Sequence, residues 1–368
     1  MTVPILRPTI AEIDLTKLAR NLQKVRAAVK PGVKLLTLVK ANAYGHGAVE
    51  IGKYLEKNRL CEFFGVASVE EGIMLREAGI KNSILVLGSI YPFEAFEYAI
   101  KNNLAITIAS QAAAEAVCKI AEKLGEQALC HVKQDTGMGR IGTRRGKVVG
   151  VIETLASHPY TILDGLYTHL SSVESDEAFT EEQIGYYRDT LTHVELKGIH
   201  INHRHVAASA AIHARPDVHY DMVRPGHSAY GLEKGYEPIL SLKTRIVYVK
   251  DVAAGASISY GRSFIADKPM KVATLPLGYG DGYLRSLSNK GEVLVHGKRC
   301  RVLGNVTMDM LMIDITQVPE AKVGDEVVVV GPQGQDEITL LELAQKAGTI
   351  DYELCTLLMP RVPRIYKE

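Results

Sequence analysis

Lys40 is the residue whose setting points most directly to chemistry. It follows LLTLV (35–39), a largely apolar run with the composition of a buried β-strand. A lysine at the end of such a strand either extends its amine to solvent or serves a function. Burial lowers the pKa of a lysine, which makes its amine a nucleophile toward an aldehyde and afterwards a base.

The residues after Lys40 could bind an anion. Tyr44 offers a hydroxyl, and Gly45 and Gly47 flank His46 just before an expected helix. Backbone N–H groups at a helix start can bind phosphate, and the helix dipole favours negative charge there. A lysine beside an anion site is the arrangement that a Schiff-base enzyme needs.

The elements that position Lys40 belong to a regular alternation. Residues 34–232 alternate short apolar runs with amphipathic runs, which indicates βα units and a parallel sheet. About eight such units over about 200 residues predict a closed (β/α)8 barrel. The expected strands are residues 35–39, 63–67, 84–88, 105–109, 129–133, 162–168, 200–206 and a last one near Tyr220–Val223.

Helix signals separate these strands. Helical patterns cover residues 69–78, 111–124 and 181–193, and the pairs Ser68–Glu71 and Thr180–Gln183 have capping-box spacing. Catalytic residues of a barrel lie at the carboxyl ends of its strands. These positions are rich in cations and small residues, which suits an anionic ligand. They are Lys40, residues 133–140, His169, residues 205–209 and residues 224–226.

The sequence changes character after about residue 240. β-rich segments alternate with glycine-bearing turns, and only residues 338–347 have a helical pattern. We therefore expect two domains. The barrel would cover residues 10–240, and a smaller, mainly antiparallel all-β domain would cover residues 241–368, joined by residues 1–9.

The composition is that of a globular, cytoplasmic protein. The net charge of +1 gives no reason to expect nucleic acid or an anionic membrane as a partner. The first residues lack a secretory-signal pattern, and no apolar stretch reaches the roughly 18 residues of a membrane helix. Five scattered cysteines without a C-x-x-C pair are typical of reduced thiols.

The segment VKANAYGHG (39–47) resembles the pyridoxal-phosphate attachment motif of the alanine racemase family. Further matches follow in the family's order along nearly the whole chain. They are KQDTGMGRIG (133–142), GLYTHL (165–170), ASAA (208–211), VRPGHSAYG (223–231), SYGRSF (259–264), LPLGYGDGY (275–283), MDM (308–310) and YELC with RVPRIY (352–366). The resemblance implies a barrel followed by a β-domain, a homodimer with shared active sites, and interconversion of L- and D-alanine for peptidoglycan.

The resemblance gives three residues a role in the reaction. Lys40 would carry pyridoxal 5′-phosphate and act as acid and base on one face of the bound amino acid. Tyr260 would enter from the other subunit and serve the opposite face, because inversion removes a proton on one side and returns one on the other. Arg224 would face the pyridine nitrogen and keep it unprotonated, which restrains transamination. Taken alone, Tyr260 is also consistent with an interface tyrosine and Arg224 with a pairing arginine at the barrel rim.

Other matched residues would bind the cofactor. His169 would lie beside it, although the residue alone is equally consistent with a structural histidine. Ser209 is also a possible helix N-cap. The residues that would hold the phosphate are Tyr44, Ser209, Gly226, His227 and Tyr352.

A further set would bind the substrate. Arg140 would hold its carboxylate with bidentate geometry, and Lys133, carbamylated in many members, would orient Arg140. Without the modification, Lys133 would be an ordinary ion-paired lysine. Met308, through its N–H, and Asp309 would contact the carboxylate from the partner subunit. The entrance would be lined by Tyr279 and Arg285.

The sequence departs from the family pattern at four positions without losing a catalytic group. Ala208 replaces an asparagine, and Thr307 replaces a small thiol. His227 stands where a branched apolar residue is usual, and Asn305 where an entrance arginine is often found. His227 and Asn305 alter the polarity of the channel and leave the substrate range open.

Three alternatives remain at this point. A serine or broad-specificity racemase differs only in the pocket, where one methylene or hydroxyl changes selectivity by about 1–3 kcal/mol. A metal-dependent hydrolase could use His203 and His205, which share a strand face near His200. It would need a third ligand, and we expect no metal site. A non-catalytic cofactor carrier would not need Tyr260 or a β-domain.

Overall fold

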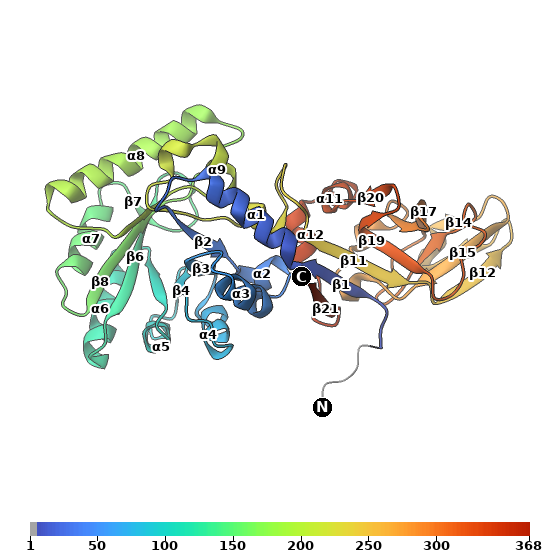
Figure 1. The fold of residues 1–368 in the computed structure, drawn as a ribbon, viewed down its shortest axis with the longest axis horizontal. Coiled ribbons are helices and arrows are strands. Elements are labelled where there is room, and N and C mark those ends of the chain that lie inside the picture. Colours follow the sequence, from blue (N-terminus) through green and yellow to red (C-terminus); the bar gives the residue numbers. More distant parts are fainter. Residues whose placement is uncertain (1–5) are drawn as a thin grey trace. The chain divides into compact units, whose positions relative to one another are not determined.

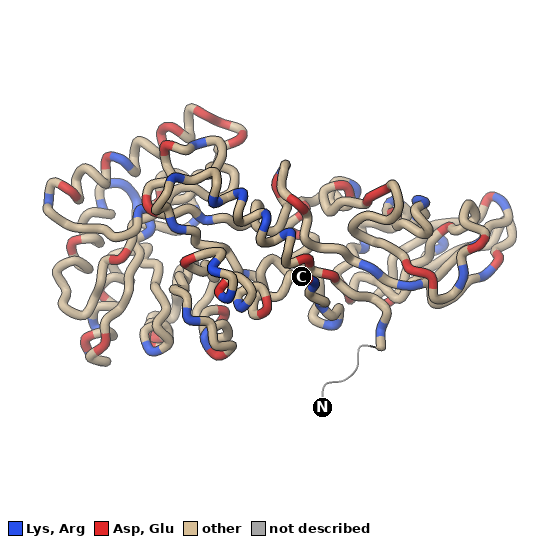
Figure 2. The backbone as a smooth tube through the Cα atoms, in the orientation of Figure 1, with Lys and Arg blue, Asp and Glu red and all other residues tan. Residues whose placement is uncertain are grey.

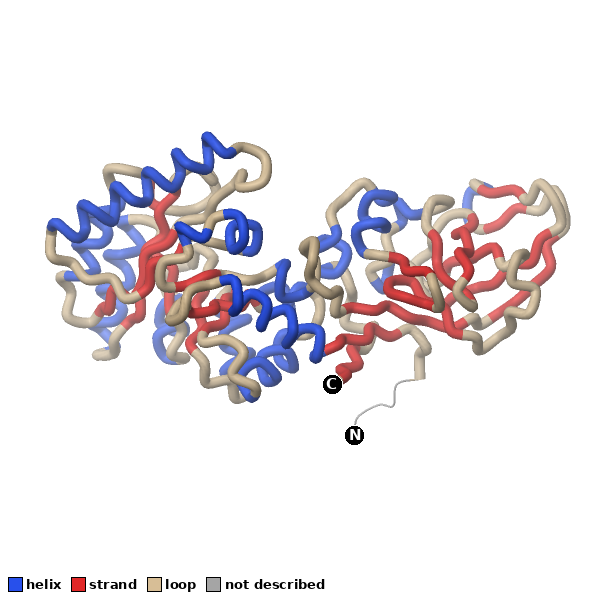
Figure 3. The backbone as a smooth tube through the Cα atoms, turned by 45° about the horizontal axis from the view of Figure 1, so that its top comes forward, coloured by secondary structure: helices blue, strands red, loops and turns tan. Residues whose placement is uncertain are grey.

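The computed structural model describes residues 6–368 and divides them into two units, which we call the barrel unit and the β-unit. The barrel unit comprises Leu18–Ala43 and Ala48–Glu237, and the β-unit comprises residues 6–17, Tyr44–Gly47 and Pro238–Glu368. Residues 1–5, part of the segment expected to join the second domain, lie outside the described residues. Figures 1 and 3 show helices flanking the strands of the barrel unit and strands predominating in the β-unit.

Within the described residues, eight parallel strands make the barrel, in the order β10-β2-β3-β4-β5-β6-β8-β9. Their bounds are β2 Lys34–Leu38, β3 Phe63–Val66, β4 Ser83–Val86, β5 Ala105–Ile108, β6 Ala128–Asp135, β8 Thr161–Tyr167, β9 His203–His205 and β10 Met222–Val223, and β7 (Thr143–Arg144) pairs with β6. Between the end strands, Arg224 N donates to Ala207 O at 2.9 Å. The barrel is thus nearly closed, as predicted, and its last strand lies at the expected position.

The strand sequences reflect burial on both faces. Every residue of β3 and β5 is buried, as expected for parallel strands covered by helices. Five strands contribute to one apolar cluster of Leu36, Phe63, Leu85, Ala105 and Met222. The short β9 differs, because its buried residues are histidines.

The helices follow the strands along the chain. Their bounds are α1 Leu15–Ala28, α2 Lys40–Tyr44, α3 Ala48–Lys57, α4 Val69–Glu77, α5 Ala95–Lys101, α6 Gln111–Leu124, α7 Val148–Ala156, α8 Glu177–Leu196, α9 Ser209–Ala214 and α10 His227–Tyr230. Ser68 caps α4 as predicted. The predicted cap at Thr180 is wrong, because Asp176 caps α8 by accepting from Phe179 N at 3.0 Å. Thr180 lies inside the helix and donates its hydroxyl to Asp176 O.

The β-unit has a ten-stranded sheet in the order β12-β15-β18-β17-β16-β19-β11-β1-β21, with β20 beside β19. Its pairs are antiparallel except β1–β21. The bounds are β1 Ile10–Asp14, β11 Leu240–Arg245, β12 Tyr248–Val252, β15 Met270–Leu275, β16 Glu292–Val295, β17 Lys298–Leu303, β18 Leu311–Asp314, β19 Glu326–Gln333, β20 Asp336–Ile338 and β21 Arg364–Lys367, with the hairpin β13 Ser257–Ile258 and β14 Phe264–Ile265. The expected helix is α11 (Leu340–Ala347). The expectation of a single helix is wrong, because a second helix, α12 (Asp351–Thr356), follows. This helix is too short to produce a helical periodicity in the sequence.

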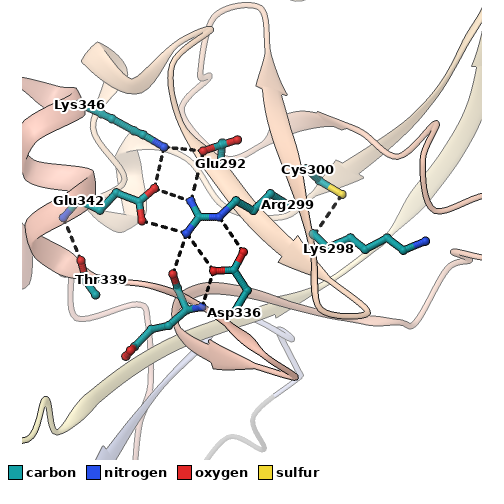
Figure 4. A network of polar contacts seen from close by, with 9 residues as sticks. Glu292, Lys298, Arg299, Cys300, Asp336, Thr339, Glu342 and Lys346 are labelled. Atoms are coloured by element: carbon teal, nitrogen blue, oxygen red, sulfur yellow. Dashed lines mark hydrogen bonds and ion pairs between the residues drawn. The ribbon is translucent and has the colours of Figure 1, made fainter.

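An ion-pair network ties α11 to the sheet of the β-unit (Figure 4). Arg299 of β17 contacts Asp336 of β20 at 2.7 Å and Glu342 of α11 at 2.6 Å. Lys346 of α11 reaches Glu292 of β16 at 2.6 Å. All of these side chains are partly exposed, so we expect each pair to stabilise the fold modestly.

The distribution of charged and apolar residues in the structure agrees with the balanced composition of the sequence. Figure 2 shows positive and negative residues interspersed in both units. Of the helices among residues 6–368, none has the length and apolarity needed to cross a membrane. All five cysteines are buried free thiols.

Candidate active site

Lys40 lies at the carboxyl end of β2 and is half-buried. Burial, and then the positive charge of Arg140, lower its pKa below the ordinary value of 10.5. A larger fraction of the amine is therefore neutral than in an exposed lysine. This is the property required of a nucleophile toward an aldehyde.

The segment labelled α2 (Lys40–Tyr44) is not a regular right-handed helix, because the chain after Lys40 makes a left-handed turn. Ala41, Asn42, Ala43 and Tyr44 have φ between 50° and 54°, which costs a non-glycine residue about 1–2 kcal/mol. Two side chains help to hold the turn. Glu71 accepts from Ala41 N at 2.7 Å, and Asn42 accepts from Ala48 N at 2.9 Å. Strain of this kind typically occurs at functional sites.

Arg224 is buried in the barrel at the end of β10 and only 3% exposed. Its guanidinium donates to the carbonyl oxygens of Thr168, His205 and Val206 at 2.8–2.9 Å. Burial lowers the pKa of Arg224 to about 10, so it remains a cation at neutral pH. The carbonyls replace part of the hydration that the charge has lost.

His169 lies beside this arginine, with Nδ1 3.4 Å from Arg224 Nη2. Burial, and then the charge of Arg224, lower the pKa of His169 to about 3. The imidazole is therefore neutral at physiological pH. A neutral ring can lie against a cofactor without adding to the positive charge of the site.

Ser209 brings together the starts of α9 and α10. Its Oγ accepts from Gly226 N at 2.9 Å and lies 3.1 Å from Ser228 Oγ. Ser209 is the first residue of α9 rather than its N-cap, which is Ala208. Two hydroxyls and a backbone N–H thus converge beside His227, a donor set suited to phosphate.

Lys133 lies near the end of β6, and Arg140 lies in the loop that follows this strand. Lys133 is 4% exposed, and its Nζ lies 5.3 Å from the centre of the Tyr167 ring. Burial, and then Arg140 and Arg224, lower the pKa of Lys133 to about 7. The positive charges of Arg140, Arg224 and Lys40 all act on Lys133, and the carboxylate of Asp135 opposes them. Positive charge therefore predominates around Lys133.

The β-unit holds the remaining candidates. Tyr260 is 74% exposed, and its carbonyl accepts from Asn305 Nδ2 at 2.7 Å. Asn305, one of the departures from the family pattern, therefore fixes the backbone of Tyr260. Ser259 Oγ donates to Asn305 O at 2.5 Å, which holds Asn305 in turn.

Met308 and Asp309 are exposed and held by Arg361. Arg361 pairs with Asp309 at 2.8 Å and donates to Met308 O at 3.2 Å. Its Nε contacts the fully buried Asp281 at 2.7 Å, which Arg7 also pairs with. The motif matches contained Asp281 and Arg361, but sequence inspection gave them no role because they act on other side chains.

The aromatic candidates of the β-unit differ in exposure. Tyr44 is buried, and burial, followed by the proximity of Cys355 and Tyr352, raises its pKa well above 10. Tyr352 is the second residue of α12 and is half-buried. Tyr279 and Arg285, predicted to line the entrance, are exposed.

The histidines considered as possible metal ligands contact other side chains instead. His205 is fully buried with Nε2 3.0 Å from His131 Nδ1, and His203 Nε2 lies 3.9 Å from Asp164. Within the described part of the chain, no group of three His, Cys, Asp or Glu side chains is arranged to hold a metal ion.

Comparison with known proteins identifies the family. Residues 13–234 match the profile described as alanine racemase, N-terminal domain, and residues 239–366 that of the C-terminal domain. The chain is 41% identical to an alanine racemase of Halothermothrix orenii, over 100% of this chain and 99% of that protein. The chain belongs to the alanine racemase family.

Solved structures of the family have the same fold. An alanine racemase of Clostridium difficile 630 superposes with a TM-score of 0.93 at 37% identity, covering 99% of this chain and 97% of that chain. The Bacillus anthracis enzyme with bound L-Ala-P gives 0.92 at 33% identity, covering 100% and 96%.

Family members are racemases that use pyridoxal 5′-phosphate. The donor chemistry of the barrel unit fits this cofactor. An amine of lowered pKa suits its aldehyde, and Ser209, Ser228 and Gly226 suit its phosphate. The excess cations suit the negative charge of both cofactor and substrate carboxylate.

Proposed function

We propose that this protein interconverts L-alanine and D-alanine with pyridoxal 5′-phosphate, and so supplies D-alanine for peptidoglycan. The observation that carries the proposal is Lys40, an amine of lowered pKa at the end of β2 in a cation-rich barrel. The resemblance to alanine racemases along the whole chain supports it.

The barrel unit would hold the cofactor. Lys40 would bind it covalently, and Ser209, Gly226 and His227 would hold its phosphate together with Tyr44 and Tyr352. When bound, pyridoxal phosphate withdraws electrons from an attached amino acid and acidifies its α-proton. Arg224 would donate to the pyridine nitrogen and keep it unprotonated, because the guanidinium stays charged at neutral pH. His169, a neutral ring, would lie beside the cofactor.

Two side chains would move the α-proton. The Nζ of Lys40 would exchange it on one face of the substrate, and the Oη of Tyr260 would exchange it on the other. The exposure of Tyr260 on the β-unit is consistent with its serving a second subunit. We accordingly propose a homodimer, located in the cytoplasm.

The substrate carboxylate would be held from two directions. Arg140 would bind it in the barrel unit, oriented by Lys133 as a carbamate. A pKa of about 7 leaves the amine of Lys133 largely neutral above that pH, and the neutral form is the one that reacts with carbon dioxide. From the partner subunit, Met308 N and Asp309 would contact the carboxylate, with Tyr279 and Arg285 at the entrance.

The test of the proposal is covalent trapping. Protein saturated with pyridoxal phosphate is reduced with borohydride, digested and mapped, and the label is expected on Lys40. Lys40→Ala should lose both label and racemisation, whereas Lys147→Ala, an exposed lysine of the same unit, should keep both. Full activity in Lys40→Ala would refute the proposal, and a panel of L-amino acids including serine would define the substrate range.

The shared site is tested by mixing subunits. Lys40→Ala and Tyr260→Phe homodimers should each be impaired, while hybrids regain activity because one of their two sites is intact. Hybrids purified with two affinity tags that remain as inactive as their parents would argue against shared sites. Cell fractionation tests the cytoplasmic location.

A further inference from the structure

A buried chain of polar side chains leads from Arg224 across the barrel interior. Arg224 Nη1 lies 3.0 Å from His205 Nδ1, and His205 Nε2 lies 3.0 Å from His131 Nδ1. His131 Nε2 lies 3.0 Å from Asp164 Oδ2. The four residues come from the end of β10 and from β9, β6 and β8, and the two histidines are fully buried.

The hydrogen positions in this chain follow from the arginine. A guanidinium only donates, so His205 Nδ1 must accept, and the proton of the neutral ring is on Nε2. Nε2–H then donates to His131 Nδ1, which leaves the proton of His131 on Nε2, directed at Asp164. Every hydrogen bond therefore points from Arg224 toward Asp164.

Asp164 is held as the acceptor at the end. Asn202 Nδ2 donates to its other oxygen at 3.0 Å. Burial raises the pKa of Asp164, but the hydrogen bonds that its carboxylate accepts from His131 and Asn202 lower the pKa, which lies well below the ordinary value. The carboxylate therefore stays ionised and accepts at both oxygens.

The surroundings pack closely against both rings. The His205 ring stacks on Tyr167 with centroids 4.6 Å apart and planes 7° apart. A Cβ at position 165 would lie 2.1 Å from His131 Nδ1, so Gly165 makes the space that this ring occupies. Close packing at these positions keeps both rings from swinging out of the chain.

We infer that Asp164 is a positioning residue for Arg224, acting through His131 and His205. Its carboxylate accepts from His131 and so stabilises the same two tautomers that the guanidinium requires, which keeps a lone pair of His205 directed at Arg224 and holds the guanidinium in place. The connection to the cofactor rests on the proposed function, because it requires Arg224 to face the pyridine nitrogen.

The substitution Asp164→Asn tests this directly. An amide can donate to His131 Nε2, which would move the proton of His131 to Nδ1 and that of His205 to Nδ1, opposite a guanidinium donor. Asn202→Ala is the matched control, because it removes the other partner of Asp164 and leaves the chain intact.

The first measurement is the tautomeric state in cofactor-free protein. Long-range ¹H–¹⁵N spectra of ¹⁵N-histidine-labelled wild type should show His131 and His205 neutral and protonated on Nε2, with signals assigned through His131→Gln and His205→Gln. A cationic ring or an Nδ1–H tautomer at either position in the wild type would overturn the inference, whether or not any variant folds.

The second measurement is cofactor binding. Asp164→Asn should change the tautomer signals, weaken pyridoxal phosphate binding about ten-fold, the size of one hydrogen bond to a charged group, and raise transamination relative to racemisation. Asn202→Ala should change none of these. Changed tautomers with unchanged cofactor affinity and absorbance would overturn the positioning role, while borohydride labelling of Lys40 would show that the proposed function still stands.

Discussion

Substituting Gly45 with alanine is expected to destabilise the protein, because two backbone segments of the β-unit approach closely at this residue. Gly45 ends the left-handed turn with φ +82°, and a Cβ there would lie 1.9 Å from Cys355 O. Real Cβ contacts under 3.0 Å essentially never occur, so the segments would have to separate by about 1.1 Å.

The magnitude follows from two contributions. A left-handed backbone costs alanine about 1–2 kcal/mol relative to glycine, and overpacking typically costs about 1–3 kcal/mol. Separation would also stretch the hydrogen bond of 3.0 Å from Arg364 Nε to Gly45 O. We therefore expect the free energy of unfolding to fall by about 2–5 kcal/mol. Cofactor binding should weaken as well, because the shift displaces Tyr44.

Gly255→Ala is the matched control. Gly255 belongs to the same unit and has φ +83°, but nothing lies within 4 Å of the position that a Cβ would take there, so this variant reports backbone strain alone. Urea unfolding followed by circular dichroism should separate the two variants by about 1–3 kcal/mol, and absorbance titration should show weaker cofactor binding only in Gly45→Ala. Equal losses of stability in both variants would refute the steric argument.

Three other predictions follow from the site. With ¹³C-bicarbonate, the carbamate NMR signal should be present above the Lys133 pKa of about 7, fade below it as the amine protonates, and be absent in Lys133→Arg; a signal that survives this substitution contradicts the assignment. Tyr260→Phe should slow α-proton exchange in D₂O by about 10²–10⁴-fold for one enantiomer only, and equal small losses for both would count against opposed bases. Burial and Arg224 hold the pKa of His205 far below 6.5, so only the unfolded chain binds this proton below that pH. As the pH drops below 6.5, the free energy of unfolding should therefore fall by up to about 1.4 kcal/mol for each pH unit. His205→Gln should flatten this slope in urea titrations, and an unchanged slope would contradict the prediction.

Local patterns were sufficient to predict much of the fold. The apolar run 105–109 predicts β5, and the amphipathic run 111–124 matches α6 residue for residue. Capping was harder to predict, because Asp176 and Thr180 both suit a helix start and only the path of the preceding chain selects Asp176. A six-residue helix such as α12 has too few turns to produce a periodicity.

In the candidate site, too, local sequence patterns predicted some features and not others. The placement of Lys40 at the end of a strand, and the collection of cations at neighbouring strand ends, were visible in the sequence because barrel topology brings those ends together. The link from Arg224 through His205 and His131 to Asp164 was not visible. It depends on which side chains of separate strands meet inside the barrel.

The sequence by itself determined the two kinds of architecture, the succession of the barrel strands and the position of the lysine, because periodicity and turn chemistry are properties of neighbouring residues. Only the tertiary structure decided the left-handed turn after Lys40, the tautomers of His131 and His205, and the hold of Arg361 on Met308 and Asp309. These depend on strand register and side-chain packing between residues far apart in the chain, which no local pattern contains.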